Sequence, residues 1–270
     1  MAFNRNGVRP SSFDARDYLF QPAAMGLRHE NLPTSVELVV PFAPWNQGNG
    51  SSRDVPCCVS CSIVTAMEVL DAQKSPETRL SVLFHYYAAR QRADRLTDLE
   101  MREGLRTAVN VGVCDLDLHL PASADAELTR EDAKAKPAVD AYNDASQRRI
   151  LGLDNATLRM RYHRIIDSRD PGPWKAAITA GFPIVLVFPI TQGYLEIVPS
   201  GNDIHGPVTG RPINPSYHAV CAFGFDKQGG LHVRDSRDQL GTVGNWWLPW
   251  PVISQPTFIS EAWVIEGVTY

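Results

Sequence analysis

The 270-residue chain lacks a long apolar segment, an excess of basic charge and a secretion signal. A membrane-spanning helix needs about 20 consecutive apolar residues, so we expect no membrane partner. The formal net charge of -4 gives no electrostatic signature of nucleic-acid binding. Residues Met1 to Arg9 are polar, without the apolar core of a signal peptide. The localisation is therefore left as cytoplasmic or exported by a non-classical route.

The cysteines do not form two spaced pairs. They stand at positions 57, 58, 61, 114 and 221, and this odd number leaves at least one without an intramolecular partner. Cys58 and Cys61 match a single Cys-x-x-Cys pattern, but Gln47 to Asp54 is a polar loop where a redox domain has a strand. A zinc site needs further ligands that no second cysteine pair or His-x-x-x-His supplies. We expect neither a metal nor an organic cofactor.

Three of these cysteines crowd the start of a predicted helix. Pro56 suits a helix entry, where its missing N–H leaves no bond unmade. Apolar residues then follow at spacings of three and four, which predicts a helix ending near Gln73: Val59, Ile63, Ala66, Met67 and Leu70. Unpaired N–H groups and the helix dipole favour a thiolate at this position. We therefore predict a catalytic cysteine here.

The chain around this helix divides into three parts. Residues 1–31 read as an extended N-terminal arm. Residues 32–150 read as a helical lobe with a strand-like run at Val36–Val40 and predicted helices at Ser81–Arg90, Asp98–Val109 and, with breaks near Pro137, Ala124–Arg149. Residues 151–270 read as a β lobe, with a helix at Pro173–Ala180 and strands at 182–188, 219–225, 231–234, 246–248 and 262–265. The pattern predicts an α+β protein, whose second lobe is an antiparallel barrel or sheet, with the site in the cleft between lobes.

Nucleophilic cysteine catalysis needs an imidazole to hold the proton and a third group to orient that imidazole. His218 is placed where the loop Asn214–Tyr217 enters a predicted strand. Asp235 follows the next strand, and neighbouring strands lie only about 4.8 Å apart. Gln47, upstream of the cysteines, carries a side-chain amide suited to donating to an oxyanion together with the Cys58 backbone N–H.

Four blocks in this order resemble the papain-like cysteine peptidases: Asn46-Gln47-Gly48, Cys58-Val59, His218-Ala219-Val220 with Phe223-Gly224-Phe225-Asp226, and Val233-Arg234-Asp235-Ser236. The bacterial branch of that family is the most similar, through Leu80 to Phe84 and Gly244 to Pro249, and Phe13 to Tyr18 looks like a segment ahead of the mature domain there. The resemblance implies a two-lobed papain-like fold and a cysteine peptidase acting on peptides or proteins. It implies Cys58 as nucleophile, His218 as base, Asp235 as orienting residue and Gln47 as oxyanion donor. It also implies that the arm lies across the cleft as an inhibitory segment.

The sequence also departs from that family. Eleven positions separate Gln47 from Cys58, Asp235 replaces the usual asparagine, and Arg237 and Leu240 replace two tryptophans. The paired glycines that bind substrate backbone have no counterpart near Leu96 to Glu100. Two other functions therefore stay open: a catalytically silent papain-like binding protein, and another Cys-His-Asp acyl-transfer enzyme such as a transglutaminase or amidase.

Overall fold

The computed structural model describes residues 8–12, 14–15, 17–26, 31–47, 55–73, 78–90, 96–121, 128–150, 162–165, 169–195, 212–237 and 244–267. The helices are α1 (Cys58–Ala72), α2 (Val82–Ala89), α3 (Met101–Asn110), α4 (Val139–Ala145), α5 (Pro171–Thr179), α6 (Gln192–Leu195) and α7 (Trp250–Ile253). The strands are β1 (Val8–Arg9), β2 (Val36–Glu37), β3 (Leu99–Glu100), β4 (Tyr162–Arg164), β5 (Ile184–Thr191), β6 (Pro212–Asp226), β7 (Gly230–Arg234), β8 (Asn245–Leu248) and β9 (Glu261–Ile265).

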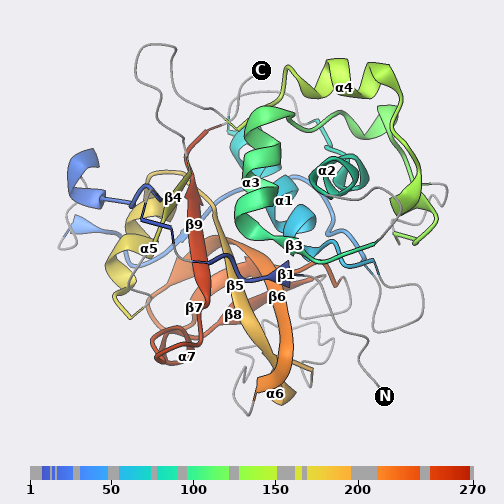
Figure 1. The fold of residues 1–270 in the computed structure, drawn as a ribbon. Coiled ribbons are helices and arrows are strands. Elements are labelled where there is room, and N and C mark those ends of the chain that lie inside the picture. The colour runs from blue at the N-terminus through green and yellow to red at the C-terminus, as the bar shows by residue number, and fades with distance from the viewer. Residues whose placement is uncertain are drawn as a thin grey trace.

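The first two predicted helices are confirmed. Helix α1 begins at Cys58 and is capped at Gln73, and α2 begins after Ser81, whose side chain accepts the backbone N–H of Phe84. Such a serine cap satisfies one of the unpaired N–H groups of a helix start. Helix α3 begins three residues later than predicted, because Leu99 and Glu100 form strand β3. Helices α1 to α4 lie together on one side of the molecule (Figure 1).

Strands β4 to β9 form one antiparallel sheet in the order β4-β9-β5-β6-β7-β8, and β2 pairs with β6. Within the described residues β4 and β8 do not pair with each other, so the sheet stays open and the barrel alternative is wrong. Strand β5 is buried along all eight residues, as its continuous apolar run predicted. The α+β class is confirmed.

Strand β6 corrects the predicted position of His218. We expected a loop as far as Tyr217, but β6 begins at Pro212 and pairs with β5, with His218 opposite Phe188. His218 therefore lies within a long central strand rather than at its entry. Turn-forming residues in this stretch favoured a loop locally, whereas pairing with β5 decides the backbone conformation.

Two buried clusters lie on opposite sides of the sheet. Val185 and Val187 of β5 pack with α1, whereas Ile184, Leu186 and Phe188 pack with α5 on the other side. This alternation is the period of two expected of a strand. Helix α1 is thus held against the centre of the sheet, and its buried first residues lie beside β6.

The N-terminal arm is fastened to both parts of the fold. Strand β1 pairs in parallel with β3 and also contacts β6, and Leu19 bridges to Arg164 of β4. The Asp17 carboxylate binds Arg102 of α3, with Oδ2 to Nη2 at 2.6 Å, and Arg164 Nη1 at 3.0 Å. The arm therefore links the helices to the sheet.

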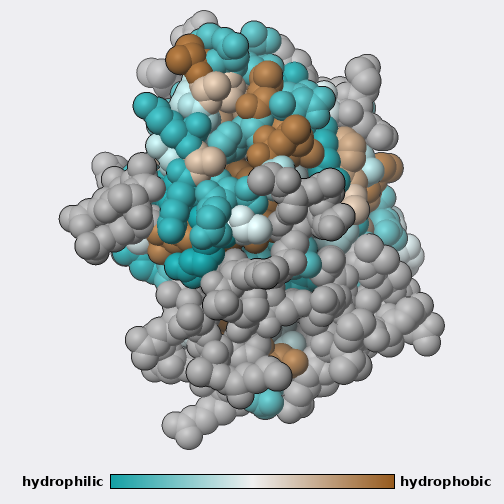
Figure 2. Space-filling model, turned by 90° about the vertical axis from the view of Figure 1, so that its right-hand side faces the viewer, coloured by the Kyte–Doolittle hydropathy of each residue, from teal (hydrophilic) through white to brown (hydrophobic). Residues whose placement is uncertain are grey.

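Hydrophobic and hydrophilic residues alternate over the described surface in Figure 2, the side at the right of Figure 1. In the described residues, no helix combines the length and apolar character needed to cross a bilayer.

Candidate active site

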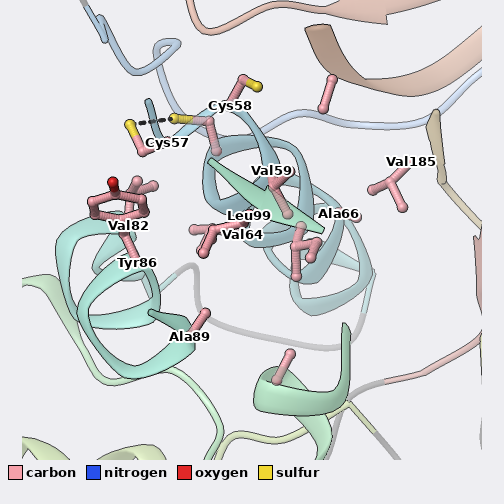
Figure 3. Close-up of a cluster of buried hydrophobic side chains, with 14 of the residues drawn as sticks. Cys57, Cys58, Val59, Val64, Ala66, Val82, Tyr86, Ala89, Leu99 and Val185 are labelled. Atoms are coloured by element: carbon pink, nitrogen blue, oxygen red, sulfur yellow. Dashed lines mark hydrogen bonds between the residues drawn. The ribbon is translucent and has the colours of Figure 1, made fainter. Parts of the chain in front are cut away.

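Cys58 is the first residue of α1 and is fully buried. The neighbouring thiols of Cys57 and Cys61 contact each other, with 3.7 Å between their sulfur atoms. In Figure 3 the sulfur of Cys58 points away from that contact, which is drawn as a dashed line. All three cysteines are free thiols. Cys58 is thus separated from a Cys57–Cys61 pair that packs inside the helical side.

The electrostatic surroundings of Cys58 differ from the prediction. Burial raises the pKa of the Cys58 thiol above its ordinary value, and the nearby Cys61, Asp98 and Asp235 act in the same direction. The Ala219 backbone N–H acts in the opposite direction by stabilising the thiolate. The helix start alone therefore does not ionise the thiol in this structure. A neighbouring carboxylate disfavours a thiolate, so ionisation of Cys58 requires a cation nearby.

His218 lies in that region, bound to Asp235. Its Nε2 is 2.8 Å from Oδ1 of Asp235, and both side chains are almost completely buried. The residue after it, Ala219, is the one whose N–H acts on the Cys58 thiol. Within the described residues no hydrogen bond joins Cys58 directly to His218. Cys58 is linked to the His218–Asp235 pair by Ala219 and by Asp235, which both act on its thiol. Nε2 of His218 faces Asp235, so Nδ1 is the remaining ring nitrogen.

Asp235 follows β7 directly and accepts four hydrogen bonds. Its Oδ1 accepts from His218 and from the Arg237 backbone N–H at 3.1 Å, and its Oδ2 accepts from the Tyr194 hydroxyl at 3.0 Å and the Trp246 indole N–H at 3.1 Å. Burial raises the pKa of this carboxyl, but His218, then Arg237 and Trp246, outweigh burial and bring the pKa below its ordinary value. Asp235 is therefore held as a carboxylate.

Gln47 lies beside the residue that follows Asp235. Its side-chain Oε1 accepts the Ser236 hydroxyl at 2.8 Å, and its backbone N–H donates to the Ser236 carbonyl at 3.0 Å. Its own carbonyl accepts the Val55 N–H at 3.1 Å, so the two ends of the segment from Gln47 to Val55 are joined by a hydrogen bond. The loop residues 48–54 lie outside the described residues. With Oε1 engaged by Ser236, the NH2 is the donor group of the Gln47 side chain.

Sequence reasoning missed the residues that surround the His218–Asp235 pair. The ring of Tyr194 in α6 lies 5.3 Å from the His218 ring, and the Arg237 guanidinium lies 5.3 Å from the Tyr194 ring. Phe188 and Trp246 pack against Tyr194 as well. These residues surround the His218–Asp235 pair at the place where the family has a tryptophan and this chain has Arg237. Leu240, at the position of the second family tryptophan, lies outside the described residues. Tyr194 lies 41 positions before Asp235, its hydrogen-bond partner, so no local sequence pattern predicts this contact.

The stretch Leu96 to Glu100, which lacks the family's glycines, carries the short strand β3. Its edge is paired with β1 of the arm. Asp98, which precedes β3, is close enough to Cys58 to act on its thiol. Burial raises the pKa of Asp98 to about 6, and Arg9 of the arm opposes that effect. Arg9 of the arm is thus close enough to Asp98 to act on its carboxyl group.

No family model matches the chain. An uncharacterized peptidase C1-like protein of Acanthamoeba polyphaga mimivirus is 24% identical over 196 residues, which are 70% of this chain and 59% of the viral protein. The chain therefore spans less than two thirds of that relative.

Solved structures agree in fold. Xylellain, a cysteine protease from Xylella fastidiosa, superposes with a TM-score of 0.76 at 23% identity over 98% of this chain and 97% of its own. A digestive procathepsin from the larval midgut of Tenebrio molitor gives 0.68 at 16% identity over 98% of this chain and 78% of its own. The protein has the fold of the papain-like cysteine proteases.

Proposed function

We propose that the protein is a cysteine peptidase that hydrolyses peptide bonds through a thioester on Cys58. The observation that carries this proposal is the buried His218–Asp235 pair, with 2.8 Å between Nε2 and Oδ1. The residue after His218 in β6, Ala219, acts on the Cys58 thiol through its backbone N–H. A nucleophile on a helix and a base on a facing strand, with a carboxylate behind the base, is the arrangement that activated cysteines require. The similarity in fold to cysteine proteases supports the same reading.

The reaction begins with proton transfer from Cys58 Sγ to Nδ1 of His218, which gives a thiolate and an imidazolium. Asp235 stabilises the imidazolium through Nε2. The thiolate attacks the peptide carbonyl carbon, and the oxyanion accepts from the Gln47 amide and the Cys58 backbone N–H. His218 then gives its proton to the leaving amine as the C–N bond breaks. Water, deprotonated by His218, hydrolyses the thioester and restores Cys58.

The substrate in this proposal is a peptide or protein bound in the cleft between residues 32–150 and 151–270, with residues 1–31 as an arm over it. Strand β1 supports this role for the arm, because it occupies the edge of β3 and contacts β6, the strand of His218. Complete burial of Cys58 and 1% exposure of His218 are also those of a covered site. Displacement of the arm should therefore precede turnover.

The proposed function is tested by alkylation and peptide hydrolysis. The protein is treated with iodoacetamide, the modified cysteine is mapped by mass spectrometry, and a fluorogenic peptide library is assayed in parallel. We expect preferential labelling of Cys58, turnover by the unmodified protein and none by Cys58→Ala. Cys114→Ala is the matched control, because Cys114 is also a buried free thiol. Equal labelling of all cysteines without turnover would refute the proposal, and labelling of Cys58 without peptide hydrolysis would favour another acyl transfer.

A further inference from the structure

Two of the four groups that bind the Asp235 carboxylate can donate a hydrogen bond but cannot accept one. On the Oδ1 side this donor is the backbone N–H of Arg237, and on the Oδ2 side it is the indole N–H of Trp246. The other two partners are adaptable: the Tyr194 hydroxyl both donates and accepts, and the His218 ring nitrogen does either according to its tautomer. Each side of the carboxylate therefore has one fixed donor.

An asparagine at this position would meet a conflict in either orientation of its amide. With NH2 on the Oδ2 side it would face the Trp246 N–H, and with NH2 on the Oδ1 side it would face the Arg237 N–H. A buried donor left facing another donor is expensive, because neither finds its acceptor. A carboxylate accepts on both sides and satisfies all four partners. The site is thus built for an aspartate.

Tyr194 adds a second contribution to this arrangement. Its hydroxyl donates to Oδ2, and its ring lies 5.3 Å from the His218 ring and 5.3 Å from the Arg237 guanidinium. Burial and the Asp235 carboxylate keep the pKa of Tyr194 above its ordinary value, so the hydroxyl keeps its proton and can donate. Trp246 and Tyr194 come from β8 and α6, so two separate elements clamp one oxygen.

We propose that Tyr194 and Trp246 are positioning residues that make an aspartate obligatory at 235 and fix it against His218. The inference rests on the proposed function, in which Asp235 orients His218. It explains why Arg237 replaces a tryptophan here: Tyr194 covers the His218 ring, and Arg237 covers Tyr194. The two act through Asp235 and do not touch the reacting atoms.

The charged and titratable groups around Asp235 come from several elements. His218 of β6 and Arg237 favour its ionised form. Tyr194 of α6 donates to it, and Cys58 and Cys61 of α1 lie close enough for Asp235 to disfavour their thiolates. Removing the Tyr194 hydroxyl removes one donor to the anion, so protonation of Asp235 becomes easier. The acid limb of kcat/KM should therefore move to higher pH.

Five variants of the full chain test the inference. Asp235→Asn should lower kcat/KM on the order of 100-fold, because one amide N–H is opposed by a donor and His218 loses its anion. Adding Trp246→Phe to Asp235→Asn should restore about tenfold, since the Asn NH2 then faces only the adaptable Tyr194 hydroxyl. Trp250→Phe in the same background is the control, because it also loses an indole hydrogen bond, to the Asp226 carbonyl. It should restore nothing.

Tyr194→Phe alone should move the acid limb of the pH profile upward by about one unit. Its control, Tyr86→Phe, removes a buried hydroxyl bonded to the Thr97 carbonyl and should leave the limb in place. Melting temperatures are measured for every variant, and Trp246→Phe should also offset the loss of melting temperature caused by Asp235→Asn.

Three results would overturn the inference: kcat/KM of Asp235→Asn within threefold of the parent, equal effects of Trp246→Phe and Trp250→Phe, or an unmoved acid limb in Tyr194→Phe. Absence of turnover in the parent would instead refute the proposed peptidase. In that case the pH dependence of Cys58 alkylation still tests the role of Tyr194. The combined effect of Asp235→Asn and Trp246→Phe on the melting temperature still tests the contact between Trp246 and residue 235.

Discussion

Replacing Asp17 by alanine should both destabilise the protein and activate it. The Asp17 carboxylate binds Arg102 through both oxygens, at 3.1 Å to Nε and 2.6 Å to Nη2, and binds Arg164 Nη1 at 3.0 Å. The Asp17, Arg102 and Arg164 side chains are only 9%, 8% and 12% exposed. Asp17→Ala would leave two nearly buried guanidinium groups without their shared carboxylate.

The expected loss of stability follows from this burial. Breaking a buried ion pair by removing one partner destabilises by about 3–5 kcal/mol, which for a chain of this size lowers the melting temperature by on the order of 10 °C. The same change should loosen the arm, so limited proteolysis should cut residues 8–26 sooner. Peptidase activity should rise, because β1 no longer stays docked on β3.

Glu103→Ala on the same helix is the matched control. Glu103 pairs with Arg106 at 2.9 Å, but both side chains are about 40% exposed, and exposed pairs contribute only about 0.2–1 kcal/mol. Melting temperatures are measured by circular dichroism, and activity with the fluorogenic peptide. Equal melting temperatures for the two variants would refute the claim that the Asp17 pairs fasten the arm. A fall in stability with unchanged activity would refute the inhibitory role of β1.

Two further predictions concern single buried side chains. Gln47→Ala should lower kcat by about 10²–10³-fold, the loss of one oxyanion donor, and should destabilise the fold by about 1–3 kcal/mol, because the buried Ser236 hydroxyl loses its acceptor; a kcat within threefold of the parent would exclude the oxyanion role. Burial raises the pKa of Glu68 to about 7 from 4.5, so the folded state favours the protonated form, and stability should fall by at most about 3 kcal/mol as pH rises from 4.5 through 7. Glu68→Gln, which keeps an acceptor for the Leu80 N–H, should reduce this loss of stability between pH 4.5 and 7, as measured by thermal melts. An unchanged pH dependence of stability would contradict its assignment to Glu68.

Features encoded locally could be predicted from the sequence. The apolar spacing after Cys58 gave α1, Ser81 supplies the cap of α2, and the continuous apolar run at 184–188 lies within the buried strand β5. His218 and Asp235 could be selected because each adjoins a recognisable strand. Their 2.8 Å contact follows from the pairing of β6 with β7.

Features that depend on distant pairing could not be predicted. The extension of β6 back to Pro212 depends on β5, and β3 exists because the arm supplies β1. The ionisation of Cys58 was predicted from its helix start alone, whereas burial acts more strongly. Tyr194 reaches Asp235 only through the path of the chain after β5. Each of these outcomes is decided by contacts that no local pattern contains.

The fastening of the arm also sets an order of events during synthesis. The Ser11 N–H donates to Glu261 Oε1, a residue 250 positions further along the chain, and Glu261 Oε2 accepts from Trp263. A ribosome therefore adds 250 residues after Ser11 before this bond has both of its partners. The bond from Ser11 cannot form until Glu261 has entered the sheet as part of β9. In the proposed arrangement the arm is fully secured over Cys58 only after β9 has formed, so the nascent chain passes through a stage in which Cys58 exists before its cover is secured.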